Sequence, residues 1–246
     1  MKNFTRLLTV ALLISIAGCS RFDFDNVFSE SLPGVTKVFI APATNQKYQV
    51  YLPSSYEPQG KTPIPVAIAL GGDLGANLKR LAEAHHFLVI IPSLTSDETF
   101  SFKLPTIGQL QTDQQTIISA LDDVLHRYHA DAKNVLLTGY DKGGYSLFWT
   151  GLHNPARFKM LVGQNVRASN EILNQLNGKT ISPRMPIYLV WGKDSNHLDD
   201  SWLAFKWIRR NGWKKINSGK YELKGGHLKR AQAAWQIWTG KPVTER

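Results

Sequence analysis

Val135-Leu136-Leu137-Thr138-Gly139-Tyr140-Asp141-Lys142-Gly143-Gly144-Tyr145 is the stretch of this sequence that decides the fold. Its first four residues are an apolar run typical of a buried strand, and a Gly-x-Asp-x-Gly turn follows at once. Residues 145–153 are compatible with a helix that Asn154-Pro155 would end. A strand, a sharp turn flanked by small residues and a helix leave one side chain exposed above a sheet. Here that side chain is Asp141.

Strands alternate with helices on both sides of this stretch. Residues 66–70 form a continuous apolar run, typical of a strand buried on both faces. Other strands are predicted at 36–40 and 48–52, as a hairpin, and at 87–91, 159–163, 187–191 and 220–223. Helices are predicted at 77–86, 169–176, 201–210 and 229–238, and from a capping box at Thr112-Asp113-Gln114-Gln115 to about residue 128. This order predicts an α/β fold: one domain with a mainly parallel sheet covered by helices on both faces.

The N-terminus has the pattern of an export signal. Lys2 and Arg6 precede the apolar run 7–17, which has the length of a secretory signal and is short for a membrane span. Ile16-Ala17-Gly18-Cys19 resembles the lipobox of bacterial lipoproteins, and Cys19 is the only cysteine of the chain. This resemblance implies cleavage before Cys19 and attachment of acyl chains, such as palmitate, to it. Ser20 resembles the outer-membrane sorting pattern. The alternative is an ordinary signal peptide with an incidental cysteine.

These features predict a lipoprotein signal peptide at 1–19, a tether at 20–34 and the α/β domain at 35–246. With 246 residues, 43% of them hydrophobic, the chain is long enough for a substantial core. Removal of residues 1–19 takes away two cations and no acid, so the net charge falls from +10 to +8. We interpret this as a basic surface without a specific partner. There is no nucleic-acid motif. The expected location is the bacterial cell envelope, on the outer membrane through the lipid anchor.

Three residues at predicted strand ends could perform chemistry. They are Asp141, then Asp194 in Trp191-Gly192-Lys193-Asp194, then His227 in Gly225-Gly226-His227. The carboxyl ends of parallel strands meet at one edge of a sheet, so these side chains are expected to lie together. Asp199 and Asp200 are alternatives to Asp194. The remaining histidines, including His197, read as helix-surface or turn residues.

Nucleophile, acid and histidine follow one another in this order in the α/β-hydrolases, where the strand–turn–helix is called the nucleophile elbow. From Tyr48 onward the chain resembles the small, capless esterases related to polyhydroxyalkanoate depolymerases and feruloyl esterases. The resemblance is carried by residues 48–53, 134–144 with 155–158, 186–194 and 225–227. It implies that His227 links Asp194 to Asp141, and that the backbone N–H groups of Lys142 and Asp73 form an oxyanion hole.

The sequence departs from these relatives at two points. Their elbow residue is usually Ser, and their oxyanion loop usually begins His-Gly, whereas here it reads Leu70-Gly71-Gly72-Asp73. Three interpretations of Asp141 follow. It is a nucleophile toward carbon, as in dehalogenases and epoxide hydrolases, although those enzymes have a cap domain and usually Trp after the nucleophile. It hydrolyses carboxylic esters by an uncommon route. Or the hydrolysis is lost, and the protein binds a ligand or a protein partner in the envelope.

Whether the chain is an enzyme therefore stays open. If it is active, the resemblance implies a carboxylic ester hydrolase acting on a small or polymeric ester. No metal-ligand spacing and no dinucleotide fingerprint is present, so neither a metal nor another cofactor is expected.

Overall fold

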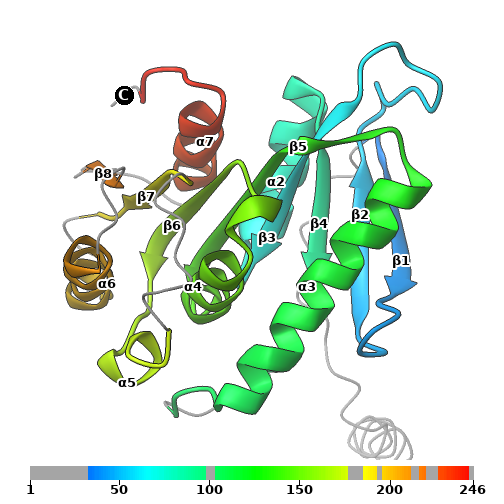
Figure 1. The fold of residues 1–246 in the computed structure, drawn as a ribbon. Coiled ribbons are helices and arrows are strands. Elements are labelled where there is room, and N and C mark those ends of the chain that lie inside the picture. Colours follow the sequence, from blue (N-terminus) through cyan, green and yellow to red (C-terminus); the bar gives the residue numbers. More distant parts are fainter. Residues whose placement is uncertain are drawn as a thin grey trace, which may run out of the picture. The chain divides into compact units, whose positions relative to one another are not determined.

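An eight-stranded sheet in the order β1-β2-β4-β3-β5-β6-β7-β8 forms the centre of the structure, a computed structural model (Figure 1). The structure describes residues 33–97, 103–176, 185–192, 196–211, 216–219 and 227–243, with the backbone alone for 216–219, 227, 228 and 230. The described residues belong to one compact unit. The strands are β1 (Val35–Ile40), β2 (Lys47–Leu52), β3 (Ile64–Leu70), β4 (Leu88–Pro92), β5 (Ala130–Asp141), β6 (Met160–Val166), β7 (Ile187–Val190) and β8 (Ile216–Gly219).

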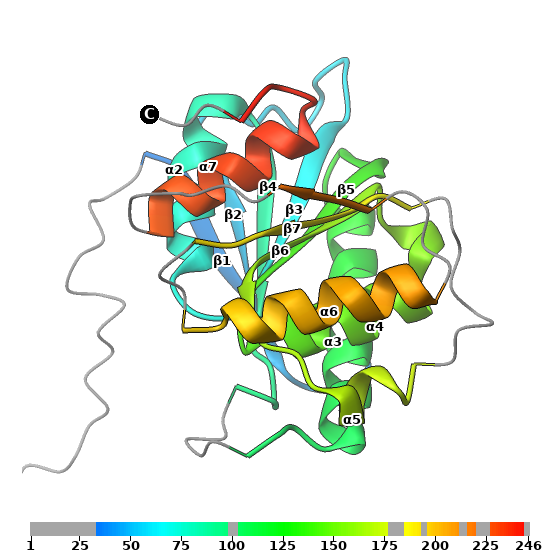
Figure 2. The ribbon, with the colours of Figure 1, turned by 90° about the vertical axis from the view of Figure 1, so that its left-hand side faces the viewer.

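The sheet is parallel from β4 to β8, and the hairpin of β1 and β2 joins it in antiparallel pairing. Helices α2 (Leu74–His85) and α7 (His227–Trp238) lie on one face. The opposite face carries α3 (Ile107–Arg127), α4 (Gly143–His153) and α6 (Leu198–Arg210) (Figure 2). Two short helices, η2 (Pro155–Arg157) and α5 (Asn170–Leu173), follow α4 and β6. Between β5 and α6 the described residues contain no cap domain, as expected.

The two layers of helices explain why the central strands read as continuous apolar runs. Along β5, Val135 and Leu137 pack toward α3 and α4, while Leu136 packs toward α2 and α7, and all three are fully buried. A strand that is buried on both faces has no position for a polar alternation. The predicted α/β fold with a mainly parallel sheet is therefore confirmed.

Helix α3 begins six residues earlier than predicted, with its N-cap at Thr106 and not at Thr112. Its capping box is formed by Thr106, whose hydroxyl oxygen accepts from the N–H of Gln109 at 3.2 Å, and by Gln109, whose Oε1 accepts from the N–H of Thr106 at 2.9 Å. The predicted capping box at residues 112–115 was wrong because Leu110 is buried and extends the apolar stripe toward the N-terminus.

The C-terminal elements also differ in extent from the prediction. Helix α5 has four residues instead of the eight predicted at 169–176. Strand β8 lies at Ile216–Gly219, before the predicted range 220–223, which falls outside the described residues.

Candidate active site

The elbow at the carboxyl end of β5 has the sharp geometry that its sequence predicts. Asp141 ends the strand with φ 47°, in the left-handed region that few residues other than glycine adopt. Gly143 opens α4, and a Cβ atom there would collide with the carbonyl group of Leu70 at the end of β3. The turn is therefore packed closely against the neighbouring strand β3, and the Asp141 side chain lies at the edge of the sheet.

The Asp141 carboxylate is held by two basic side chains. Arg167 Nε donates to Asp141 Oδ1 at 2.6 Å, and His197 Nε2 lies 3.0 Å from the same oxygen. The backbone N–H of Arg167 also donates to the Asp141 carbonyl at 2.8 Å. The side chains of Asp141, Arg167 and His197 are 32%, 25% and 22% exposed. This partial burial makes the ion pair stronger than one on an open surface.

A bulge in β6 brings Arg167 to the elbow. Tyr140 pairs with Gln164 and Asp141 pairs with Val166, so Asn165 is an extra residue on β6. Asn165 has φ 44°, and its Oδ1 accepts from the N–H of Gly192 at 3.0 Å, just after β7. A bulge redirects the side chains that follow it. Arg167 consequently meets Asp141 through both its backbone and its guanidinium group.

Asp200 and Tyr145 lie close to the ion pair of Asp141 and Arg167. Burial raises the pKa of Asp200, while the nearby His197 and Arg167 and the backbone N–H of Ala168 oppose the shift. Burial also raises the pKa of Tyr145 to about 12, with the charge of Asp200 adding to it and that of Arg167 opposing it. The first turn of α6, the end of β6 and the elbow helix thus form one electrostatic cluster.

A second, fully buried carboxylate lies behind the elbow helix. Asp113 on α3 accepts from the N–H and the hydroxyl of Thr95, at 2.7 and 2.8 Å. The hydroxyls of Ser96 and Ser146 donate to its other oxygen at 2.5 and 2.7 Å. Ser146 belongs to α4, so this network ties α3, α4 and the loop after β4 together.

Asp97 follows this network in the same loop. Burial, and then the charge of Asp113, raises the pKa of Asp97 to about 6, while Lys142 opposes the shift. The residue keeps an exposed surface, so solvent screens its carboxyl more than that of Asp113. Asp97 is therefore a carboxyl group near the elbow whose pKa is raised above that of an ordinary aspartate.

The structure locates the predicted site residues as follows. Asp141 lies at the elbow, as expected. Asp73 and Lys142 are the N-cap residues of α2 and α4, just beyond the adjacent strands β3 and β5, so their backbone remains a candidate for an oxyanion hole. Asp194 falls outside the described residues. His227 is the first residue of α7, and its side chain is not described.

Of the alternative acids, Asp199 is exposed, whereas Asp200 lies close to His197 and Arg167.

The sequence analysis missed Arg167, and it read His197 only as a surface or turn residue. The position of each residue after a strand could have indicated it, since Arg167 follows β6 directly and His197 lies between β7 and α6. Residues that follow parallel strands meet at the carboxyl edge of the sheet. The bulge at Asn165, which directs Arg167, has no signature in the sequence alone.

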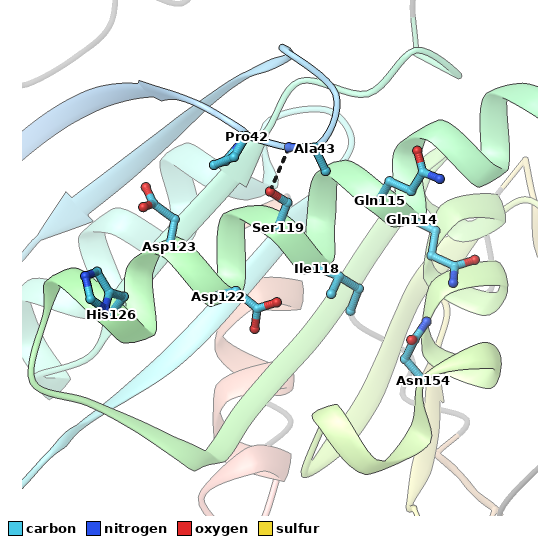
Figure 3. Close-up of a pocket in the computed structure, with 10 residues that line it drawn as sticks. All are labelled: Pro42, Ala43, Gln114, Gln115, Ile118, Ser119, Asp122, Asp123, His126 and Asn154. Atoms are coloured by element: carbon cyan, nitrogen blue, oxygen red, sulfur yellow. Dashed lines mark hydrogen bonds between the residues drawn. The ribbon is translucent and has the colours of Figure 1, made fainter.

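A groove of about 640 Å³ lies elsewhere, between the β1–β2 turn and the outer face of α3 (Figure 3). Pro42, Ser119 and Asn154 are among the residues around it. Its two acidic residues already have partners, because Asp122 pairs with Arg157, and Asp123 binds Arg127 and the Tyr48 hydroxyl. None of the elbow residues lines this groove.

The described residues show neither a metal-binding cluster nor a membrane-spanning helix. No group of three or more His, Cys, Asp or Glu side chains is placed to hold a metal ion. No helix in this part of the chain has the length and apolar character needed to cross a membrane.

Comparison with known proteins was informative at the level of structure. No protein-family model and no curated protein sequence matches the chain. The S-formylglutathione hydrolase FrmB of Staphylococcus aureus is similar with a TM-score of 0.63 and 13% identity, over 84% of this chain and 95% of that one. A fungal esterase from Rhizomucor miehei gives a TM-score of 0.61 at 9% identity, over 84% of each chain. A ferulic acid esterase from Anaeromyces mucronatus gives 0.55 at 12% identity, over 82% of this chain and 86% of that one.

At these identities the likeness concerns the fold alone. The chain has the α/β-hydrolase fold of these esterases, in a single domain.

Proposed function

We propose that this chain is an envelope-anchored protein of esterase-like fold whose elbow site binds an ester or alcohol ligand without hydrolysing it at the rate of an esterase. The observation that carries this proposal is the bond from Arg167 Nε to Asp141 Oδ1 at 2.6 Å, with His197 Nε2 at 3.0 Å from the same oxygen. A carboxylate is already a weak nucleophile toward a carbonyl carbon, and these contacts engage its lone pairs further.

Charge compensation at the elbow indicates the kind of ligand. Arg167 neutralises Asp141, and Asp200 lies close to both basic groups. An uncharged ligand therefore fits this site better than an ion, because an ion would disturb pairs that are already formed. The backbone N–H groups of Asp73 and Lys142 would serve the carbonyl oxygen of such a ligand.

Hydrolysis of short aryl esters by the full chain in mild detergent tests the proposal. The native chain and Asp141→Asn are expected to show no hydrolysis above the uncatalysed rate, while Asp141→Ser gains measurable activity. Rapid hydrolysis by the native chain that is lost in Asp141→Asn would make Asp141 catalytic and would end the proposal. In parallel, the same esters should raise the unfolding temperature of the native chain, because a ligand that binds only the folded state stabilises that state.

A second candidate function is slow ester hydrolysis by a water molecule that the elbow activates. The contact between Asp141 and His197 favours it, since a carboxylate that orients an imidazole is a common arrangement for general-base catalysis. This route predicts activity in the native chain that His197→Gln removes.

Anchoring through Cys19 is part of the same proposal. It rests on the charged start, the apolar run 7–17 and the lipobox-like residues 16–19. Two or three acyl chains hold a protein at a membrane far more firmly than one.

A further inference from the structure

We propose that His197 is the proton-exchanging imidazole of the elbow site, oriented by Asp141 and backed by Asp200. This deepens the second candidate function by assigning how His197 is oriented and held, and it rests on that function in taking the elbow as the ligand site. Three sets of observations carry it: the contact with Asp141, the position of Asp200, and the way in which His197 is held.

The contact fixes where the imidazole carries a proton. His197 Nε2 lies 3.0 Å from Asp141 Oδ1, within hydrogen-bond distance. An ionised carboxylate only accepts hydrogen bonds, so Nε2 must be the donor and must carry hydrogen. The imidazole is thus set in one tautomer by the elbow side chain, and Nε2 is the ring nitrogen that faces the elbow.

The charged and titratable groups of the cluster around His197 come from four elements. Asp141 ends β5 and Arg167 follows β6; Tyr145 lies on α4, and Asp199 and Asp200 lie in the first turn of α6. His197 and Asp200 are three residues apart, which brings neighbouring helix positions together. The imidazole therefore lies between a carboxylate on the elbow and a second one in the first turn of its own helix.

His197 is held at this place by the start of α6. Its carbonyl accepts from the N–H of Ser201 at 3.0 Å. The Ser201 hydroxyl in turn donates to the carbonyl of Val166 at 3.1 Å, next to Arg167. These bonds dock the N-terminus of α6 on the end of β6, so the imidazole stays beside the elbow.

Other described histidines have different surroundings. The His85 ring stacks on Trp235 with a centroid distance of 3.6 Å, and His86 Nδ1 lies 2.8 Å from the Ser55 hydroxyl. His153 Nδ1 lies 2.8 Å from the carbonyl of Trp149. Among these residues and His197, only His197 contacts the elbow.

The first arm of the test needs no activity. The full chain is labelled with ¹⁵N-histidine in detergent, and the imidazole nitrogen shifts are recorded for the native chain, Asp141→Asn and His126→Gln. His126 lies on the exposed face of α3, away from the elbow. We expect a signal, assigned by its loss in His197→Gln, that reports hydrogen on Nε2 and moves in Asp141→Asn but not in His126→Gln. A His197 signal that is the same in the native chain and in Asp141→Asn would overturn the proposal.

The second arm uses hydrolysis by the Asp141→Ser chain. In this variant the introduced hydroxyl takes the place of the carboxylate beside Nε2, so Nε2 can accept the hydroxyl proton. Adding His197→Gln should lower the rate at least about 100-fold, the usual contribution of a general base, and abolish the acid limb of the pH profile; adding His126→Gln should change neither. Dependence on His227 with no dependence on His197 would overturn the proposal. Failure of Asp141→Ser to gain activity would count against the proposed function alone, since the nitrogen shifts still decide the role of His197.

Discussion

At the scale of single residues, Asp141 shows how an elbow can carry a carboxylate. Aspartate tolerates the left-handed conformation better than most residues, so it can occupy the turn at φ 47°. Arg167 and His197 then compensate its charge. The sequence was sufficient to predict where Asp141 lies, because glycines and an apolar strand surround it. Its partners come from distant segments, and their approach depends on a bulge and a helix start.

The ion pair of Arg167 and Asp141 should contribute measurably to stability. Arg167→Met is expected to lower the free energy of unfolding by about 1–2 kcal/mol, near the lower end of the roughly 1.5–3 kcal/mol for hydrogen bonds to charged groups. The half-exposed side chains keep this below the cost of breaking a fully buried pair. Chemical denaturation measures it, with Arg127→Met as the control. Arg127 is half-exposed in its pair with Asp123 one helix turn away, so its loss should cost less than that of Arg167.

A double-mutant cycle separates the pair from other effects of the substitution. Asp141→Asn should cost less in the Arg167→Met background than alone, with a coupling of about 1 kcal/mol. Strict additivity of the two changes would show that the pair does not stabilise the fold.

Asp97 gives a prediction about pH. Burial and the charge of Asp113 raise its pKa to about 6, above the value of about 4 for an unfolded chain. Its protonated form is therefore favoured by folding, and the stability that this provides is present below about pH 4 and is lost as the pH rises through 6. Asp97→Asn should make the protein more stable than the native chain at pH 8 and equally stable at pH 4.

Solvent limits the size of this effect. Because Asp97 keeps an exposed surface, we expect a gain of about 1 kcal/mol at pH 8, less than the full shift would give. Unfolding in urea at the two pH values measures it. A difference between variant and native chain that is the same at pH 4 and pH 8 would contradict the assignment.

At the scale of elements, the sequence predicts which segments are strands and helices better than where they begin. Continuous apolar runs such as that of β3 identify the central strands, because burial on both faces leaves only one pattern. The start of α3 was misplaced because two segments have the spacing of a capping box, and only the three-dimensional structure shows which one forms it. Asp113, in the segment that does not, serves as a buried acceptor instead.

That buried acceptor should be one of the most sensitive positions of α3. Asp113→Ala leaves the N–H of Thr95 and the hydroxyls of Ser96 and Ser146 without their acceptor, and is expected to lower the free energy of unfolding by about 3 kcal/mol. Asp122→Ala on the same helix is the matched control. Asp122 is 54% exposed in its pair with Arg157, and its loss should cost at most about 0.5 kcal/mol. Equal effects of the two changes would refute a special role for the Asp113 network.

At the scale of the whole molecule, the fold agrees with that of the similar esterase structures, whereas the side chains of the elbow are a property of this chain. Fold and site follow from different constraints. The sheet needs apolar segments in the right order along the chain, whereas the chemistry needs a few side chains at the carboxyl edge of the sheet. The first requirement is spread over many residues and is visible in the sequence. The second depends on Asp141, Arg167 and His197, whose mutual distances only the folded chain defines.

The last prediction concerns how the protein is attached in the cell. If residues 16–19 are a lipobox, bacteria expressing the full chain should incorporate labelled palmitate into it, and the protein should sediment with membranes. Cys19→Ser should abolish the label and release the domain from the membrane fraction after export, because the acyl chains supply the anchoring free energy of about 0.8 kcal/mol per buried methylene. The matched variant Ser20→Asp should keep the label while retaining the protein in the inner membrane, since the residue after the cysteine is the one that the sorting pattern concerns. A Cys19→Ser chain that still sediments with membranes would instead point to the basic surface or the uncleaved signal as the attachment.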